Sequence, residues 1–184
     1  MSINYVIATY DGQCRRTHEY PKPHEVLMAH LEKITTLKHN LTKITVMKAR
    51  NDGPKVKKYY NIEHLVPKLK CEFEQVDVEN FGYSMGQWMK CYEMNKTYDW
   101  YIFIEDDYCP NMDNFDRLLV DMYKEKFGED VGLLCSFIQG SKNYVDEDNL
   151  PLHFEGVVVL SRQTLEGLYG DKRWGGDPRK YLDL

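Results

Sequence analysis

The hydrophobic and polar positions along the chain change their period repeatedly, which predicts strands alternating with helices. Short apolar or alternating runs predict six strands, at residues 4–9, 43–48, 72–78, 100–104, 132–138 and 156–160. Apolar residues at helical spacing predict helices at 24–38, from 84 onward and at 114–124. This alternation predicts an α/β fold of one domain over residues 1–184, with a mostly parallel central sheet flanked by helices.

The predicted helices carry apolar stripes that we expect to face the core. The stripes are Leu27, Leu31 and Ile34; Met85, Trp88, Met89 and Tyr92; and Phe115, Leu118, Leu119 and Met122. Ser84 with Gln87 three residues later has the pattern of a capping box at the start of the second helix. Ser161 could cap a short last helix that ends before Gly170. Residues 56–69 are ambiguous and could hold another short helix.

Three consecutive carboxylates, Glu105, Asp106 and Asp107, follow the nearly continuous apolar strand at 100–104. Such a run is typical of the buried centre of a sheet, and open α/β sheets bind ligands at the carboxyl ends of their strands. Adjacent carboxylates repel one another and lose hydration, and Mg²⁺ or Mn²⁺ relieves both costs. The alternative is a solvated turn, because acids before a helix are mildly stabilising. A Pro-Asn pair that separates the acids from the next helix favours the metal site.

Composition restricts the function further. The chain has 184 residues and a net charge of −5, which argues against a general nucleic-acid-binding protein. Its 14 Tyr could offer flat surfaces with polar tips to sugars and bases, or could simply be half-buried. No apolar run approaches the roughly 20 residues that span a membrane, and the first residues lack the pattern of a signal peptide. We therefore expect a cytoplasmic protein with no membrane span.

The five cysteines agree with that location. They stand at positions 14, 71, 91, 109 and 135, an odd number with no pair at the spacing of a zinc site or a redox motif. We expect free thiols in a reducing compartment.

The stretch Tyr98–Pro110, with its Glu-Asp-Asp triplet, resembles the DXD region of GT-A fold glycosyltransferases. Three further segments resemble family-2-like members in the same order along the chain. They are the first strand at 3–10, an Asn-x-Gly segment at 80–86, and an acceptor-side strand ending in Ser-Arg at 153–162. The resemblance implies a GT-A type, Rossmann-like fold whose N-terminal half binds the sugar donor and whose C-terminal part binds the acceptor. It also implies a metal-dependent glycosyltransferase that uses a nucleoside-diphosphate sugar, with UDP the commonest nucleotide, and a glycan or other hydroxyl acceptor.

The resemblance also implies roles for the matching residues. Asp107, together with Asp106, would bind the Mn²⁺ or Mg²⁺ ion that bridges the donor diphosphate. Glu105 and Asp106 match positions near the ribose. The loop that holds base and ribose is matched by Thr9, Tyr10 and Asp11.

Other candidate residues have two interpretations. Ser84 and Gln87 lie where a helix N-terminus could face the donor, although a capping box explains them equally well. Arg50, at the end of the second predicted strand, could stabilise the leaving diphosphate or lie on the surface. An inverting transferase needs a carboxylate base for the acceptor hydroxyl, and Asp177 and Glu155 are the candidates.

Two other functions remain open. A sugar nucleotidyltransferase would use the same metal and nucleotide, but it usually carries a Gly-rich phosphate loop after the first strand, which residues 8–12 match poorly. A non-catalytic carbohydrate- or metal-binding module would use the acids and tyrosines without a nucleotide. A dinucleotide oxidoreductase is disfavoured because G-x-G-x-x-G is absent after the first strand. Nucleotide binding therefore separates the two enzymes from the binding module.

Overall fold

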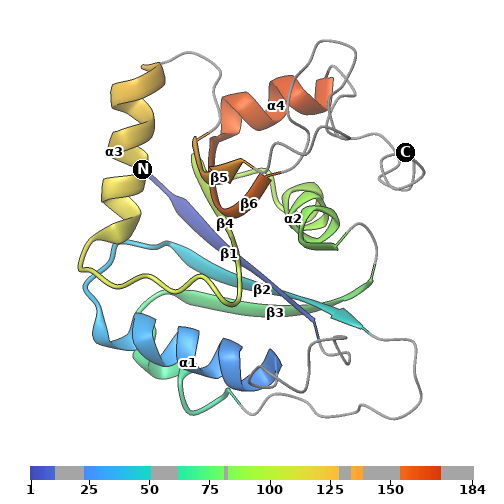
Figure 1. Ribbon diagram of the computed structural model, residues 1–184, viewed down its shortest axis with the longest axis vertical. Helices are drawn as coiled ribbons and strands as arrows, with labels where there is room; N and C mark the ends of the chain where they lie inside the picture. The colour runs from blue at the N-terminus through green and yellow to red at the C-terminus, as the bar shows by residue number, and fades with distance from the viewer. Residues whose placement is uncertain (11–22, 51–61, 81–82, 129–133, 139–153, 171–184) are drawn as a thin grey trace.

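A single twisted sheet organises the computed structural model, which describes residues 1–10, 23–50, 62–80, 83–128, 134–138 and 154–170 (Figure 1). Its strands are β1 Ile3–Tyr10, β2 Lys43–Arg50, β3 Glu72–Glu79, β4 Trp100–Glu105, β5 Leu134–Ile138 and β6 Phe154–Ser161. They lie in the order β3-β2-β1-β4-β6-β5. The β1–β2, β1–β4 and β2–β3 pairs are parallel, whereas β6 runs antiparallel to β4 and β5. The predicted α/β fold with a mostly parallel sheet is confirmed.

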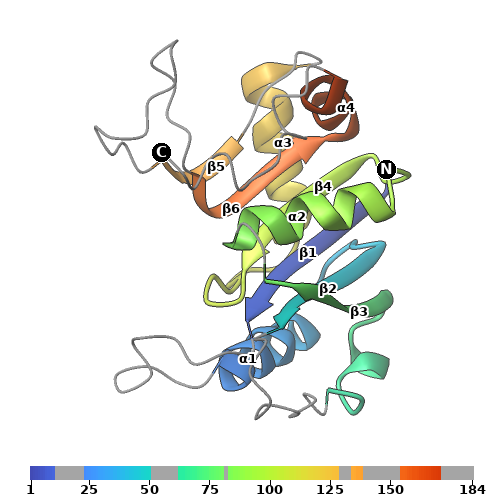
Figure 2. The ribbon, with the colours of Figure 1, turned by 90° about the vertical axis from the view of Figure 1, so that its right-hand side faces the viewer.

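Helices cover both faces of this sheet (Figures 1 and 2). They are α1 Pro23–Thr36, α2 Tyr83–Met94, α3 Phe115–Phe127 and α4 Arg162–Gly170, with a 3₁₀ turn at Val66–Lys68. Side chains of α1 and α3 share one buried cluster with the sheet, and side chains of α2 and α4 share a second cluster on the opposite face. None of these helices, in the part of the chain that the structure describes, is long and apolar enough to cross a membrane.

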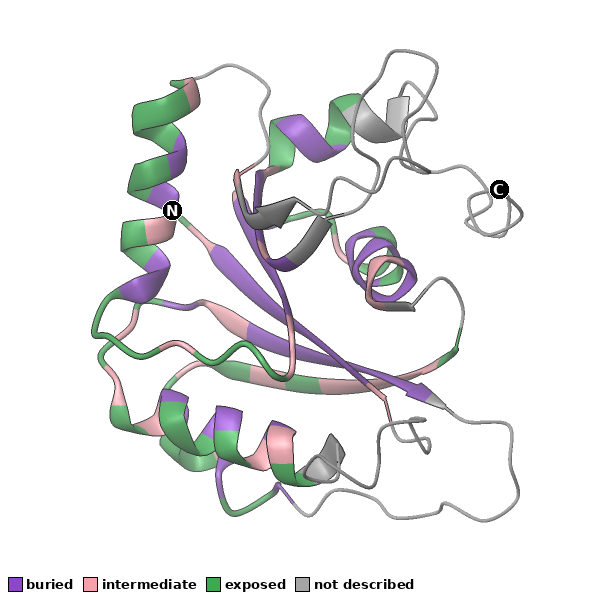
Figure 3. Cartoon of the chain, in the orientation of Figure 1, coloured by how far each residue is buried: buried purple, intermediate pink, exposed green. Residues whose placement is uncertain are grey.

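The strands β1 and β4 form the centre of the sheet and are buried on both faces (Figure 3). Successive side chains of a strand point to opposite faces. Tyr5 and Ile7 therefore join the cluster with α1, while Val6 and Ala8 join the cluster with α2. Burial on both faces explains why these two strands appear in the sequence as continuous apolar runs.

The predicted core stripe of α3 is partly wrong. Phe115 is buried as expected, but Leu118 and Met122 are each 46 % exposed. The helix buries Val120 and Tyr123 instead. Both stripes have helical spacing and differ only by a rotation of the helix about its axis, so periodicity does not choose between them. Packing chooses, because the Tyr123 ring lies against β4 and its hydroxyl bonds to a threonine of α4.

The other two stripes are confirmed. Leu27, Leu31 and Ile34 of α1 are fully buried. In α2, the predicted stripe is buried except for one half-buried methionine. The predicted cap of α4 is also present, since the Ser161 Oγ accepts a hydrogen bond of 3.1 Å from the Thr164 N–H.

Hydrogen bonds hold the start of α3 against the loop after α1. The Lys38 N–H donates to the Asp113 carboxylate (2.9 Å), and the Asn40 N–H donates to the carboxylate of Asp116 (2.6 Å). The Asn114 N–H donates in turn to the Lys38 carbonyl (2.7 Å). Asn114 has a positive φ of 57°, a conformation that asparagine tolerates better than most residues. The segment that leaves β4 is therefore anchored at its far end.

The described cysteines are free thiols, as expected: Cys71, Cys91 and Cys109. Cys14 and the side chain of Cys135 lie outside the described residues. Burial raises the pKa of the Cys91 thiol to about 12, which makes it a structural rather than a reactive group.

The orientation of α3 can be tested by two substitutions. Val120→Ala should lower the free energy of unfolding by about 2 kcal/mol, because it removes buried methyl groups and leaves a cavity. Met122→Ala should change it by less than about 0.5 kcal/mol, because the side chain is half exposed. Urea denaturation measures both values. The reverse order would mean that the stripe predicted from the sequence is the buried one.

Candidate functional site

The carboxyl ends of β1, β2, β3 and β4 meet at one edge of the sheet. These strands end at Tyr10, Arg50, Glu79 and Glu105. Because β6 runs antiparallel to β4, its first residues lie at the same edge. Three of the predicted site segments, at the ends of β1, β2 and β4, are therefore brought together by parallel pairing, where ligands of open α/β sheets bind.

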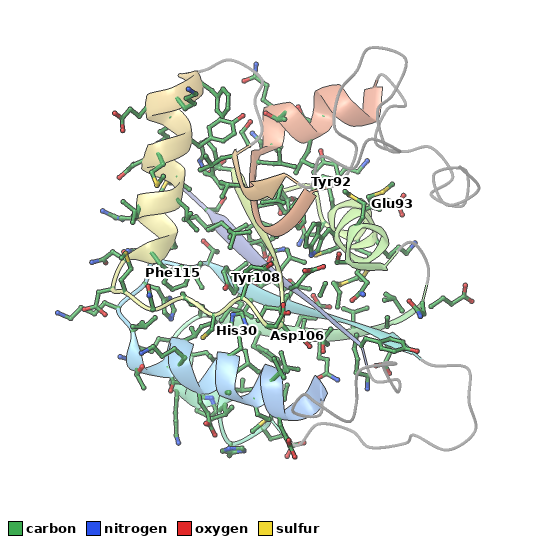
Figure 4. The ribbon with its side chains drawn as sticks, in the orientation of Figure 1. His30, Tyr92, Glu93, Asp106, Tyr108 and Phe115 are labelled. Carbon is green, nitrogen blue, oxygen red and sulfur yellow. The ribbon has the colours of Figure 1, made fainter. Side chains whose placement is uncertain are left out.

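Asp106 is anchored at this edge through its N–H, its carbonyl oxygen and one carboxylate oxygen (Figure 4). Its N–H donates to the Ala8 carbonyl at 3.1 Å, which continues the β1–β4 pairing one residue beyond the strand. Its carbonyl oxygen lies 3.0 Å from Nδ1 of His30 on α1. Its carboxylate Oδ2 accepts a hydrogen bond of 2.6 Å from the Thr9 hydroxyl. The position of the acidic turn, residues 105–107, is thus determined by β1 and α1 together.

The helix α2 holds the same strand ends from the opposite face. The buried Gln87 side chain accepts a hydrogen bond of 3.1 Å from the Thr9 N–H. The Trp88 ring N–H donates to the Ile104 carbonyl at 3.3 Å. The prediction of a capping box at Ser84 is wrong in this respect, because α2 begins at Tyr83 and the amide oxygen of Gln87 serves β1. The amide oxygen of Gln87 thus has a long-range partner that the local pattern did not indicate.

The three carboxylates of the turn differ in their surroundings. Asp106 and Glu105 are half-buried, whereas Asp107 is exposed. The pKa of Asp106 is raised to about 6, chiefly by burial. The Thr9 hydroxyl lowers it and the charges of Asp107 and Glu105 raise it, and about 6 is the net result. The repulsion expected from the sequence contributes to the raised pKa of Asp106, and Asp107 is the most exposed of the three acids.

His30 is a site residue that the sequence analysis missed. It is 1 % exposed, and burial lowers its pKa to about 4 against the small opposing effect of its bond to Asp106. Its Nε2 lies 2.9 Å from the hydroxyl of Tyr5 on β1. The sequence did contain a signal, since His30 falls between Leu27 and Leu31 of the α1 stripe, at a position where a core residue would be expected.

The structure describes the other donor-side candidates only in part. Tyr10 and Ser84 are half-buried at the site edge, at the end of β1 and in the first turn of α2. The backbone of Arg50 ends β2 opposite Glu79, but its side chain lies outside the described part of the structure. Asp11 also lies outside the described residues.

The two candidates for the catalytic base are not tested by side-chain geometry. Asp177 lies outside the described residues, and only the backbone of Glu155 is described. That backbone belongs to β6, opposite Phe137 of β5. The β4–β6 register runs from Trp100 opposite Ser161 to Phe103 opposite Val158. Continuing it along both strands leads from Phe103 toward the acidic turn and from Val158 toward Glu155.

Within the described ranges, no group of three or more His, Cys, Asp or Glu is arranged to hold a metal ion by itself. A cation that arrives with phosphate needs fewer protein ligands, because Mg²⁺ sites use one or two carboxylates together with phosphate oxygens and water. The acidic turn offers oxygen donors of this kind. Burial and the neighbouring charges together raise the pKa of Asp106, and a cation would relieve both effects. The residues present therefore fit a phosphate-bound divalent ion.

A cavity of about 230 Å³ lies beside the turn, between residues 108–112 and α3. Its walls are mostly apolar and include Tyr5, Ile104, Phe115, Leu119 and Val157. Such a lining does not suit a diphosphate. The polar edge of the sheet, rather than this cavity, has the chemistry for a nucleotide.

No model of a known protein family matches the chain, and no curated protein matches it in sequence. Solved structures do match in fold. A cytidylyltransferase from Leptospira borgpetersenii superposes with a TM-score of 0.55 at 13 % sequence identity. The match covers 92 % of this chain and 64 % of the cytidylyltransferase, so this chain spans less than two thirds of that protein's length. Mouse xyloside xylosyltransferase 1 gives 0.53 at 10 % identity, covering 94 % and 71 %.

A third similar structure is CMP:2-keto-3-deoxy-manno-octonic acid synthetase complexed with CTP. It gives a TM-score of 0.53 at 12 % identity and covers 93 % of this chain and 78 % of that one. At these identities the likeness shows the fold alone. The chain has a GT-A-like, Rossmann-like α/β fold, which nucleotidyltransferases and glycosyltransferases share.

The buried His30 should make stability depend on pH. Because burial lowers its pKa from 6.5 to about 4, the unfolded chain takes up a proton before the folded protein does. The stabilisation is fully present above pH 6.5 and is lost as the pH falls through about 4. The difference between the two pKa values corresponds to roughly 3 kcal/mol of unfolding free energy. Denaturant unfolding from pH 7 to pH 4, without added metal, measures this effect.

The variant His30→Asn is the comparison for that series, because Asp106 acts in the opposite sense. A raised pKa means that the Asp106 carboxyl stabilises the fold more as the pH falls toward 4. The excess stability of the wild type over the variant should therefore shrink by roughly 3 kcal/mol between pH 7 and pH 4. Parallel curves for the two proteins would show that His30 is not buried in its neutral form.

Proposed function

We propose that this protein is a nucleotide-sugar-dependent glycosyltransferase whose acidic turn binds the donor diphosphate through Mn²⁺ or Mg²⁺. The hydrogen bond between Thr9 and Asp106 carries the proposal, because it joins the ends of β1 and β4 at the ligand-binding edge of the sheet. The GT-A-like fold supports it, since mouse xyloside xylosyltransferase 1 shares that fold. UDP is the nucleotide that we propose to test first.

Different residues at this edge would hold different parts of the donor. Thr9 and Tyr10 end β1 where base and ribose would lie, and Gln87 holds the Thr9 backbone in place. Asp107, exposed at the turn, is the proposed principal ligand of the cation. Asp106 has Oδ2 engaged by the Thr9 hydroxyl, so it would offer the cation its Oδ1 only. When bound, the ion acts as a Lewis acid that neutralises charge on the leaving diphosphate.

The residues that bind the acceptor would lie on β6 and in the part of the chain that follows it. A carboxylate there would take the proton of the acceptor hydroxyl as the new glycosidic bond forms. Glu155 is our first candidate for this base, because β6 begins at the edge where the acidic turn lies. Asp177 is the second candidate, from the sequence alone.

A sugar nucleotidyltransferase is the second candidate function. Two structures that share the fold are cytidylyltransferase-type enzymes, and one of them was solved with CTP. Such an enzyme joins a nucleoside triphosphate to a sugar and releases pyrophosphate, whereas a glycosyltransferase consumes the finished nucleotide sugar. The weak match of residues 8–12 to a Gly-rich phosphate loop favours the glycosyltransferase.

Calorimetric titration tests the donor site. The wild type should bind UDP in the presence of Mn²⁺ and much more weakly without it. Asp107→Asn should lower the metal-dependent affinity by about 100-fold or more, because a metal contact to charged phosphate is worth several kcal/mol. Asp121→Asn on the exposed surface of α3 removes the same charge elsewhere and should bind like the wild type.

The same titration with CTP separates the alternatives. Preference for CTP, followed by pyrophosphate release with a sugar substrate, would replace the glycosyltransferase by the nucleotidyltransferase. Equal affinity of wild type and Asp107→Asn for UDP with Mn²⁺ would mean that the acidic turn is not the metal site. If neither nucleotide binds, the non-catalytic carbohydrate- or metal-binding module is the remaining function.

The role of the base can be tested separately from binding. Glu155→Gln should keep the affinity for UDP and Mn²⁺ but lower the rate of sugar transfer by about 10²–10⁴-fold, because a general base acts only in the reaction step. Glu125→Gln, on the exposed surface of α3, is the matched control. A loss of rate in Asp177→Asn alone would assign the base to Asp177, and normal rates in both variants would rule out both residues.

A further inference from the structure

The polar chain Tyr5–His30–Asp106 crosses an otherwise apolar layer between α1 and the sheet. Figure 4 shows where His30 and Asp106 of this chain lie. The neighbours of His30 on the inward face of α1 are Leu27, Leu31 and Ile34, all fully buried. A buried imidazole loses hydration and contributes less to the core than an apolar side chain of similar size. What His30 adds at this position is a polar contact to the backbone of the acidic turn.

The contacts of His30 determine which of its ring nitrogens carries the proton. The Asp106 carbonyl can only accept, so Nδ1 must be the donor across the distance of 3.0 Å. In the neutral ring Nε2 is then an acceptor, and the Tyr5 hydroxyl donates to it across 2.9 Å. Tyr5 is fully buried on the central strand β1, so the ring is held from the middle of the sheet.

The contact to the Asp106 carbonyl adds a third restraint on this residue at the centre of the turn. Its N–H is bonded to β1, its carboxylate to Thr9, and its carbonyl to His30. Rotation of the backbone about Asp106 would move Glu105 on one side and Asp107 on the other. A donor on the carbonyl therefore restrains the directions from which both flanking carboxylates reach the ligand.

From this arrangement we infer that His30 is a positioning residue of the nucleotide–metal site, acting through the Asp106 carbonyl, with Tyr5 selecting its Nδ1–H tautomer. The inference rests on the proposed function, because it concerns the same acidic turn. Partners that orient metal ligands from behind typically contribute 10- to 100-fold to metal affinity. His30 would have this effect without touching the cation or the nucleotide.

Two amide variants separate this role from simple core packing. The asparagine amide nitrogen occupies a place close to Nδ1 of histidine, and the glutamine amide lies nearer to Nε2. His30→Asn should therefore keep the donor to Asp106, whereas His30→Gln should keep only a partner for Tyr5. Calorimetry with UDP and Mn²⁺ should show about tenfold or greater loss of affinity in His30→Gln and recovery of most of it in His30→Asn. The exposed His64→Gln is the control.

The outcomes distinguish the inference from the proposed function. No binding of UDP with Mn²⁺ by the wild type, and none of CTP, overturns the proposed function and this inference with it. Binding by the wild type with equal affinity in His30→Gln overturns the inference alone. Equal loss in the Asn and Gln variants also overturns it, because a packing role does not depend on which amide position carries the donor.

A spectroscopic measurement keeps the inference testable if a His30 variant fails to fold. Long-range ¹H–¹⁵N correlation of the histidine rings in the wild type should show His30 as the neutral tautomer with the proton on Nδ1. Tyr5→Phe removes the donor to Nε2 and leaves only the Asp106 carbonyl to favour Nδ1–H, so the preference for this tautomer should weaken and UDP affinity with Mn²⁺ should fall. An Nε2–H tautomer in the wild type would overturn the inference.

Discussion

The parallel pairing of β1 with β4 is the constraint on which the rest of this structure depends. It places Ala8 beside Glu105, and the next step along both strands brings Thr9 beside Asp106. A shift of the register by one residue would turn every side chain of a strand to the other face of the sheet. Both strands are buried on both faces, so such a shift would break the packing of two cores at once. The geometry of the acidic turn therefore depends on the stability of the central sheet.

Polar groups at the carboxyl edge extend this arrangement across four strands. Thr9 lies beside Lys48 of β2, and Lys48 lies beside Asp77 of β3. The buried Lys48 ammonium is 3.1 Å from the Asp77 carboxylate, and Thr9 bonds to Asp106 on its other side. Buried charges of this kind contribute little net stability unless they are paired and hydrogen-bonded. The Lys48–Asp77 and Thr9–Asp106 contacts give this end of the sheet a polar edge beside the apolar interior.

The sequence predicted the fold and the acidic turn well, because both depend on strong local patterns. A continuous apolar strand that ends in three acids can be recognised without any neighbour. The sequence did not predict which face of α3 is buried or what Gln87 binds. Leu118 and Val120 are equally apolar, and a glutamine three residues after a serine suggests a local cap. Contacts to β4, α4 and β1 decide both cases, and no local pattern contains them.

His30 shows most clearly the difference between what local sequence patterns determine and what tertiary contacts decide. The sequence by itself determined the alternation of strands and helices, the two-sided burial of β4, and the position of the carboxylates at a strand end, since these follow from periodicity and from the cost of burying charge. Only the tertiary structure decided that a histidine of α1, 76 residues away in the chain, meets the backbone of Asp106. The physical reason is that a hydrogen bond requires two groups within about 3 Å, and that proximity arises only when α1 packs on the sheet.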